Sequence, residues 1–132
     1  MPLKFKEHDL QVFVFDVLRL NEKTDPRLKW VYAVPNGDFR SWAIGKRLKL
    51  EGVKSGVSDI CLPFGGHTID GYHPGAYIEM KSESGTVSKA QQEFLDFVKG
   101  QGYATLVAYH YDPALDFIEH YVGLKLKGRD YK

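Results

Sequence analysis

The amino-acid sequence predicts an α/β fold, a mixed β-sheet flanked by helices, with the element order α-β-α-β-β-α-β-α. Apolar residues recur with the 3.6-residue period of helices, and short β-branched or aromatic runs lie between those stretches. Gly, Pro, Asn and Asp cluster at the boundaries, as expected for turns. Because such elements pack as helices against one sheet, the 132 residues are predicted to form a single domain, 1–132, with a basic, flexible tail from about residue 124.

Composition restricts the class of protein. Hydrophobic residues make up 43% and charged residues 27%, so disordered and fibrous chains are excluded. Cys61 is the single cysteine, which excludes a disulfide framework and a cysteine-based zinc or redox site. Since no apolar run approaches the length of a membrane span, we expect a soluble intracellular protein with no membrane partner.

The first helix is predicted over residues 5–20, because apolar side chains recur at i, i+3, i+4 and i+7. These are Leu10, Phe13, Val14 and Val17. Val12, Phe15 and Leu18 are also apolar but lie off this stripe. A helix that is apolar on most sides is covered by the core or by another subunit, so we expect these three to contribute to a twofold interface.

The remaining elements follow from local composition and its boundaries. Four strands are predicted where β-branched and aromatic residues gather, at residues 30–34, 58–62, 75–81 and 104–109. Three further helices are predicted at residues 42–51, 89–100 and 112–122, with Ser41, Ser88 and Asp112 as their N-caps. An irregular connection is expected after Gly65.

Polar residues on two of these strands form the strongest candidate site. Glu79 and Lys81 are two residues apart, so their side chains share one face of the strand. Alone, such a pair is most often a solvated ion pair. Asp59, however, begins the preceding strand, and if the two strands are neighbours it lies beside Glu79 at one end of the sheet. Hard oxygen ligands of this kind select Mg²⁺ or Mn²⁺ over zinc.

Two helical residues extend this cluster, each with a structural alternative. Gln91 lies on the apolar face of its predicted helix, where it either supports a polar site or hydrogen-bonds at its own helix start. Glu7 and Gln11 are four residues apart on the first helix. Glu7 either offers a further carboxylate to the cluster or stabilises the helix dipole.

Charge is uneven along the chain although its net value is only +1. Between residues 40 and 54 a single acid, Glu51, stands against five cations: Arg40, Lys46, Arg47, Lys49 and Lys54. A basic segment in a near-neutral chain indicates either a footprint for a polyanion or an ordinary solvated helix face.

Several short blocks follow one another along the chain: Glu7…Gln11, Val34-Pro35-Asn36-Gly37…Arg40, the segment 52–59, Ile78-Glu79-Met80-Lys81, and Ser88…Gln91. Taken in this order, they resemble the VRR-nuclease (VRR-NUC) family of the PD-(D/E)XK nuclease superfamily. The resemblance spans roughly residues 5–110 and points to the small stand-alone phage or bacterial type, with a restriction-endonuclease-like sheet. One departure is Ser58, where the superfamily commonly has proline before the acidic residue.

The resemblance implies a role for each residue of the cluster. Asp59 would be the central metal ligand and Glu79 the second, with the Met80 carbonyl oxygen and Glu7 as further ligands. Lys81 would orient or help deprotonate the attacking water, and Gln91 would support the site. DNA would be held by the basic segment and its flanking polar residues: Asn36, Arg40, Lys46, Arg47, Lys54 and Ser55.

The implied activity is hydrolysis of DNA phosphodiester bonds by an endonuclease that needs Mg²⁺ or Mn²⁺. The resemblance further implies selectivity for branched DNA, as in Holliday junction resolvases, a homodimer, and a place in the cytoplasm of a bacterial or phage-infected cell.

Other interpretations stay open at this point. A DNA-binding module of the same fold would bind without cutting under any metal. A hydrolase that uses Asp59 and Glu79 as an acid/base pair would act without metal. A histidine-based metal site is disfavoured, because no two of its candidates have helical i, i+4 spacing: His67, His73, His110 and His120.

Overall fold

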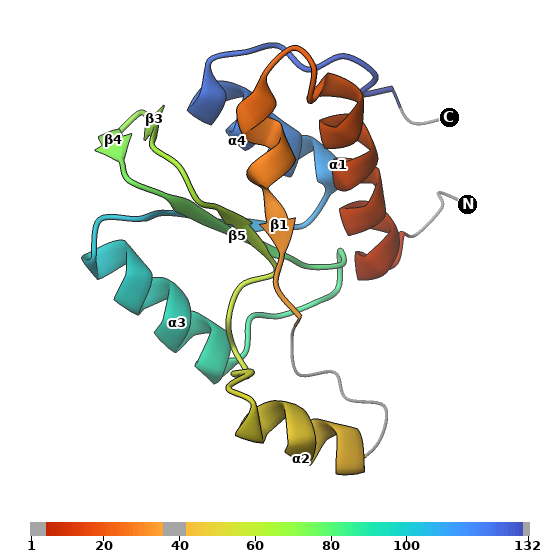
Figure 1. Cartoon of the computed structure of the whole chain (residues 1–132), viewed down its shortest axis with the longest axis vertical. Helices are drawn as coiled ribbons and strands as arrows, with labels where there is room; N and C mark the ends of the chain where they lie inside the picture. Colours follow the sequence, from red (N-terminus) through yellow and green to blue (C-terminus); the bar gives the residue numbers. More distant parts are fainter. Residues whose placement is uncertain (1–4, 36–41, 131–132) are drawn as a thin grey trace.

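A computed structural model describes residues 5–35 and 42–130 and confirms a mixed sheet flanked by helices (Figure 1). The sheet has the strand order β1-β2-β5-β6. Its strands are β1 (Tyr32–Ala33), β2 (Ile60–Leu62), β5 (Ala76–Met80) and β6 (Ala104–Ala108). β1, β2 and β5 pair antiparallel, whereas β6 runs parallel to β5.

Three helices cover the two faces of this sheet. α1 (Glu7–Asn21) and α4 (Tyr111–Val122) lie together on one face, and α3 (Lys89–Gly100) lies on the other (Figure 1). The main apolar core fills the α1/α4 side and includes Leu10, Val14, Ile60, Ile78, Leu115 and Ile118, all of them buried. The predicted stripe of α1 thus packs against the alternate, inward-facing residues of the strands.

One prediction about α1 is wrong. Leu18 was expected off the core stripe, but it is only 1% exposed and belongs to the protein's own core, whereas Val12 is 43% exposed and Phe15 is half-buried. The η1 segment (Pro26–Trp30) folds back along α1, and its Leu28 is buried in the same core. Helical periodicity shows which residues are apolar, but a neighbouring segment decides which of them are covered.

Three local predictions also differ from the structure. The strand expected at 30–34 is only the two-residue β1, because Pro26 begins a 3₁₀ turn in which the Asp25 side chain accepts a hydrogen bond from Arg27 N–H. The connection after Gly65 is a β-hairpin, with β3 (Gly66–Thr68) paired to β4 (Gly71–His73). The N-cap of α4 is His110, whose ring accepts from Asp112 N–H, and not Asp112.

α2 (Trp42–Leu50) projects away from the rest of the described chain (Figure 1). The side chains described along it are mostly exposed, including Ile44 and Leu50. Its predicted cap, Ser41, lies outside the described residues. α2 therefore presents its cations to solvent with little support from the core.

The segment after residue 124, expected to be a flexible tail, packs instead against α1 and α4. Asn21 donates to the Lys127 carbonyl oxygen and accepts from Lys127 N–H. Arg129 lies within 3.2 Å of three carboxylates of α4, those of Asp112, Asp116 and Glu119. Arg129, one of the cations of the basic tail, thus forms ion pairs within the protein.

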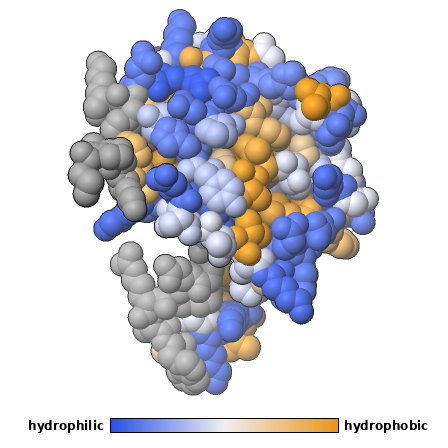
Figure 2. All heavy atoms as spheres, turned by 180° about the vertical axis from the view of Figure 1, so that it is seen from behind, coloured by the Kyte–Doolittle hydropathy of each residue, from blue (hydrophilic) through white to orange (hydrophobic). Residues whose placement is uncertain are grey.

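None of the helices within residues 5–35 and 42–130 has the length and apolar character needed to cross a lipid bilayer. Seen from behind, most of the surface is hydrophilic, with an apolar band across its middle (Figure 2).

Candidate active site

The pairing of β2 with β5 brings the predicted acidic residues together. Ile60 lies opposite Ile78, so the next pair outward in this antiparallel register is Asp59 and Glu79. Opposed residues in such a ladder share one face, and Lys81 follows two residues later on that face. The arrangement expected from the sequence, two carboxylates beside one ammonium at one end of the sheet, is thus present.

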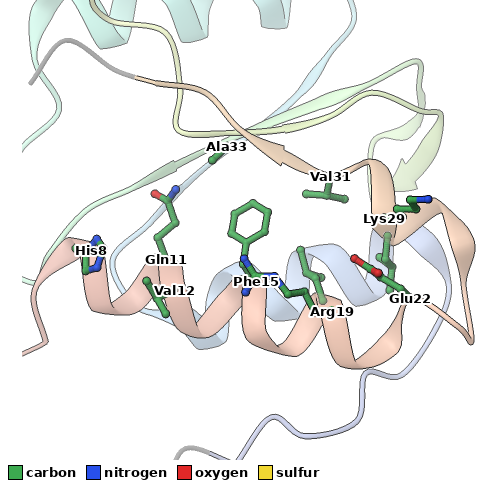
Figure 3. A pocket seen from close by; sticks show the side chains of 11 residues that line it. His8, Gln11, Val12, Phe15, Arg19, Glu22, Lys29, Val31 and Ala33 are labelled. Carbon is green, nitrogen blue, oxygen red and sulfur yellow. The ribbon is translucent and has the colours of Figure 1, made fainter.

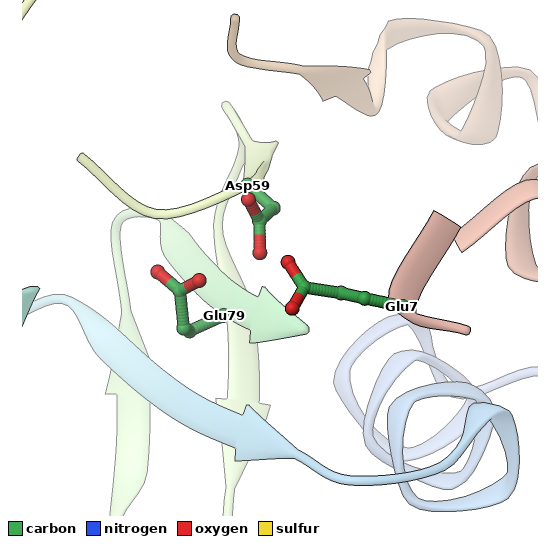
Figure 4. Close-up of side chains that lie close together, drawn as sticks. All are labelled: Glu7, Asp59 and Glu79. Carbon is green, nitrogen blue, oxygen red and sulfur yellow. The ribbon is translucent and has the colours of Figure 1, made fainter. Parts of the chain in front are cut away.

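The third carboxylate comes from α1. Glu7 is the first residue of that helix, and its carboxylate points toward those of Asp59 and Glu79 (Figure 4). One oxygen from each of the three residues lies within 4.8 Å of the others. Among the described residues this is the single group of three or more His, Cys, Asp or Glu side chains spaced to hold a metal ion.

Backbone hydrogen bonds fix the position of Asp59. Its carbonyl oxygen accepts from Val34 N–H at 2.7 Å, which ties it to the end of β1. Its Oδ2 accepts from Met80 N–H, also at 2.7 Å, which ties the side chain to β5. One carboxylate oxygen is therefore engaged by the backbone, and the residue itself is buried.

Glu79 has an unusual environment for an acid. It is 0% exposed, and its Oε2 lies 3.3 Å from Gln91 Nε2 and 3.8 Å from Lys81 Nζ. Its Oε1 is buried and has no hydrogen-bond partner among the described residues. Burial above all, then the hydrogen bond and charge of Asp59, raises the pKa of Glu79 to about 9, and the charge of Lys81 only partly offsets this.

Gln91 both hydrogen-bonds at the start of its own helix and reaches the acidic cluster, so the two interpretations of its position hold together. Its Oε1 accepts from Ser88 N–H at 2.9 Å, and Ser88 Oγ in turn accepts from Gln91 N–H, which makes a capping box at the start of α3. Its Nε2 donates to Glu79 across the sheet. The cap therefore orients the amide that reaches the carboxylate.

This donor set fits a divalent cation. A buried carboxylate oxygen without a partner is costly in free energy, and Glu79 carries this oxygen within a cluster that holds two more carboxylates and a single ammonium group. A cation that prefers oxygen ligands would satisfy that oxygen and offset the repulsion among the three acids. Glu7, Asp59 and Glu79 would hold it, with the neighbouring Met80 carbonyl as a further oxygen donor.

The predicted DNA-binding residues lie in different parts of the molecule. Asn36 and Arg40 fall outside the described residues. Lys46 and Arg47 are exposed on α2, where Arg47 pairs with Glu51 at 3.3 Å. Lys54 and Ser55 are exposed in the loop that follows.

Close packing fixes that loop beside α3. Gly56 has a φ of +87°, and a Cβ there would lie 2.7 Å from the Ala90 carbonyl oxygen, so only glycine allows the approach. Since Ala90 is next to Gln91, the loop carrying Lys54 and Ser55 lies at the end of α3 that supports Glu79.

Sequence reasoning assigned no role in the site to the other residues that border the acidic cluster. Glu7 and Asp59 open into a pocket of about 550 Å³ that is also lined by His8, Gln11 and the 33–35 segment. The hydrogen bond from Val34 to Asp59 places that segment there, which no local pattern indicates. His73, a candidate in the histidine alternative, instead bonds Thr68 and the Gly102 carbonyl oxygen.

Comparisons with known proteins identify the family and the fold of the chain. The model of the VRR-NUC domain family matches residues 7–110, which contain the whole acidic cluster. A solved structure described as a VRR_NUC domain protein superposes with a TM-score of 0.70 and 20% sequence identity, covering 93% of each chain. That structural likeness bears on the fold. No curated protein matches the chain. This chain belongs to the VRR-NUC domain family, whose fold is of the nuclease type.

Proposed function

We propose that this protein is a DNA endonuclease that requires Mg²⁺ or Mn²⁺ and hydrolyses phosphodiester bonds at the Glu7–Asp59–Glu79 cluster. The observation that carries the proposal is the convergence of three carboxylates beside the Lys81 ammonium, with a buried oxygen on Glu79 that has no hydrogen-bond partner in the described part of the chain. Membership of a nuclease-type family supports the same reaction and DNA as its substrate.

The reaction needs an attacking water in line with the leaving 3′ oxygen and positive charge near the phosphate. Bound divalent metal supplies that charge and makes a nearby water more acidic. Lys81, 3.8 Å from Glu79 Oε2, orients the water and stabilises the negative charge that develops on the phosphate. Gln91 keeps the Glu79 carboxylate in place through its hydrogen bond from the capped end of α3.

Binding of DNA involves the cations near this end of the molecule. Lys54 and Ser55 would contact the sugar–phosphate backbone beside α3, and Lys46 and Arg47 would contact it from the projecting α2, together with Asn36 and Arg40. Backbone contacts of this type position the substrate and leave base sequence unread, which suits an enzyme selective for DNA structure.

A cleavage assay tests the proposal. Labelled four-way junction and matching linear duplex are incubated with wild-type protein in Mg²⁺, Mn²⁺ or EDTA, alongside Asp59→Asn. Asp70→Asn is the matched control, because Asp70 is an exposed aspartate of the β3–β4 turn. We expect cutting that needs metal, that Asp59→Asn loses and that Asp70→Asn keeps.

Other outcomes would contradict it. Tight binding without cutting in either metal would indicate a binding module. Cutting that persists in EDTA would indicate acid/base hydrolysis without metal.

Two cuts across a junction need two active sites, so the proposal includes a homodimer. Leu18 is buried in the core and is therefore not available for a subunit interface. The apolar band on the back surface supports an interface with a second copy of the chain instead (Figure 2). Light scattering at micromolar concentration should give twice the 15.0 kDa chain mass, with paired symmetric nicks on the junction. A monomeric mass would remove the dimer from the proposal.

A further inference from the structure

The start of α1 carries a proposed metal ligand. Glu7 is the first residue of this helix, and in the described part of the chain the N-cap residue, Lys6, makes no side-chain hydrogen bond that caps it. The first N–H groups of a helix have no partner within the helix, so a first turn without such a cap frays easily. The reach of Glu7 into the acidic cluster (Figure 4) therefore needs support from another part of the chain.

The side of α1 that faces β1 gives this turn little support. A hollow of about 510 Å³ lies between the helix and the η1–β1 segment, and Gln11 and Phe15 point toward it from the helix (Figure 3). The pocket of about 550 Å³ beside Asp59 adjoins Glu7 itself. Because side chains next to a hollow lack packed neighbours on that side, the contacts that hold the helix start come from elsewhere.

Ring contacts with the turn between β6 and α4 supply this support. Phe5, two residues before Glu7, packs edge-on against the rings of His110 and Tyr111, with a centroid distance of 6.0 Å to each. The His110 and Tyr111 rings lie 4.0 Å apart, and Phe13, from the second turn of α1, lies 4.5 Å from Tyr111. Such aromatic contacts are favourable in addition to the area that they bury. They hold the first two turns of α1 against the start of α4.

The same turn is tied to the other side of the site. Ala108, the last residue of β6, accepts a hydrogen bond from Lys81 N–H at 2.8 Å. His110 caps α4 through its Nδ1, which accepts from Asp112 N–H. Asp112 in turn pairs with Arg129 of the C-terminal segment, with 3.2 Å between Oδ1 and Nη2. The β6–α4 turn therefore contacts both the strand that carries the ammonium group and the helix that carries the third carboxylate.

We propose that Phe5 and His110 are positioning residues for the metal site, because their ring contact fixes the first turn of α1 and so keeps the Glu7 carboxylate in the acidic cluster. This inference rests on the proposed function, since it takes Glu7 as a metal ligand. Phe5 and Tyr111 lie outside residues 7–110, so the family match assigns no role to either. Groups that orient a metal ligand commonly change metal affinity by about 10–100-fold when they are removed.

Binding of Mn²⁺ without DNA tests this role, because it is read independently of cleavage. Titration calorimetry of the full chain measures the affinity. Phe5→Leu should weaken Mn²⁺ binding about tenfold, whereas Phe5→Tyr, which keeps an aromatic ring, should leave it unchanged. Phe117→Leu is the matched control, because Phe117 is also half-buried and its ring lies 5.8 Å from a tyrosine ring, in the second half of α4. Its Mn²⁺ affinity should match that of the wild type.

A second variant separates the ring of His110 from its role as a cap. Asparagine is a good N-cap residue, so His110→Asn keeps a capping acceptor for α4 and removes the ring that contacts Phe5. Mn²⁺ affinity should fall severalfold, with little change in the urea midpoint of unfolding. This variant keeps the test valid if Phe5→Leu folds poorly.

A double variant shows whether Phe5 acts through Glu7. Glu7→Gln removes the ligand itself and should weaken Mn²⁺ binding more than Phe5→Leu does. Once the ligand is gone its position no longer matters, so adding Phe5→Leu to Glu7→Gln should cause no further loss of affinity. Losses that multiply in the double variant would indicate a general structural effect and would overturn the inference.

The outcomes also separate this inference from the proposed function. Mn²⁺ affinity that is unchanged in Phe5→Leu and His110→Asn contradicts the positioning role alone, whatever the cleavage assay gives. Mn²⁺ binding that depends on both residues, without cleavage of any DNA, contradicts only the proposed function. A wild-type chain that binds no Mn²⁺ contradicts the metal site itself and, with it, this role.

Discussion

Ile78 and Glu79 are neighbours in β5, and both are 0% exposed, yet they lie in opposite environments. Ile78 faces the α1/α4 side, where the main apolar core stabilises the fold by roughly 1.5–3 kcal/mol per buried aliphatic side chain. Glu79 faces the α3 side, which is lined by rings such as Tyr77 against Phe94 and ends in the acidic cluster. Burying its carboxylate costs free energy that the other face offsets. The α1/α4 face of the sheet therefore supplies most of the apolar burial that stabilises the fold, and the α3 face carries Glu79 and Lys81 of the candidate site.

The largest effect is expected on the α3 side. Lys81→Met keeps an apolar stem of similar length and removes the ammonium beside Glu79. Cleavage should fall about 10³-fold, as when one group that stabilises transition-state charge is removed. Single-turnover cleavage in Mg²⁺ measures this, with urea unfolding to verify that the free energy of unfolding changes by less than about 1 kcal/mol. Wild-type cleavage by this variant would contradict the role given to Lys81.

The opposite result is expected on the α1/α4 side. Leu115→Ala, at a fully buried position of α4, should lower the free energy of unfolding by about 2–5 kcal/mol through lost burial and a cavity. Cleavage per folded molecule should be unchanged. Urea denaturation measures the first and a cleavage assay at low temperature the second. Leu50→Ala, at an exposed position of α2, is the matched control and should shift stability by less than about 0.5 kcal/mol.

The two faces should also differ in their response to pH. The pKa of Glu79 is raised from 4.5 to about 9, so the folded protein holds a proton that the unfolded chain releases above pH 4.5. The associated stability is fully present below pH 4.5 and is lost as pH rises through about 9. In EDTA, the free energy of unfolding should therefore decrease between pH 5 and 9, by at most about 1.4 kcal/mol per pH unit for one proton.

A glutamine variant isolates that proton. Glu79→Gln should remove most of this decrease, whereas Glu83→Gln, at an exposed acid of the next loop, should keep it. Urea unfolding at a series of pH values gives the comparison. Added Mg²⁺ or Mn²⁺ should stabilise the wild type more at pH 8.5 than at pH 6, because metal and proton compete for the same carboxylates. Parallel pH profiles for wild type and Glu79→Gln would contradict this account.

The smallest effect is expected at Ser88, which both caps α3 and helps to orient Gln91 toward the candidate site. Ser88→Ala removes the N-cap of α3 and should cost about 1 kcal/mol of stability. It should also reduce cleavage severalfold, because the capping box orients the Gln91 amide toward Glu79. Ser88→Thr keeps the cap and should restore both, whereas Ser84→Ala, at an exposed position, should change neither. Loss of stability with unchanged cleavage would separate the cap from the site.

Sequence patterns predicted the helices and strands that have strong internal periodicity. The stripe of α1, the capped start of α3 at Ser88 and the alternation of β5 all lie in the structure where the sequence places them. Predictions were wrong where a neighbour decides the outcome. Leu18 is covered because η1 folds back along α1, and the strand expected from residue 30 is shortened because Pro26 begins a 3₁₀ turn before it.

In the candidate site, too, some features follow from local sequence patterns and others depend on neighbouring segments. The sequence by itself determined that Glu79 and Lys81 share a face, because side chains in a strand alternate with a period of two residues. Only the tertiary structure decided that Glu7 meets Asp59, that Glu79 is fully buried with a raised pKa, and that Glu7 and Asp59 open into a pocket. These features join elements far apart in the chain, and burial and charge at such meeting points depend on packing that no local pattern contains.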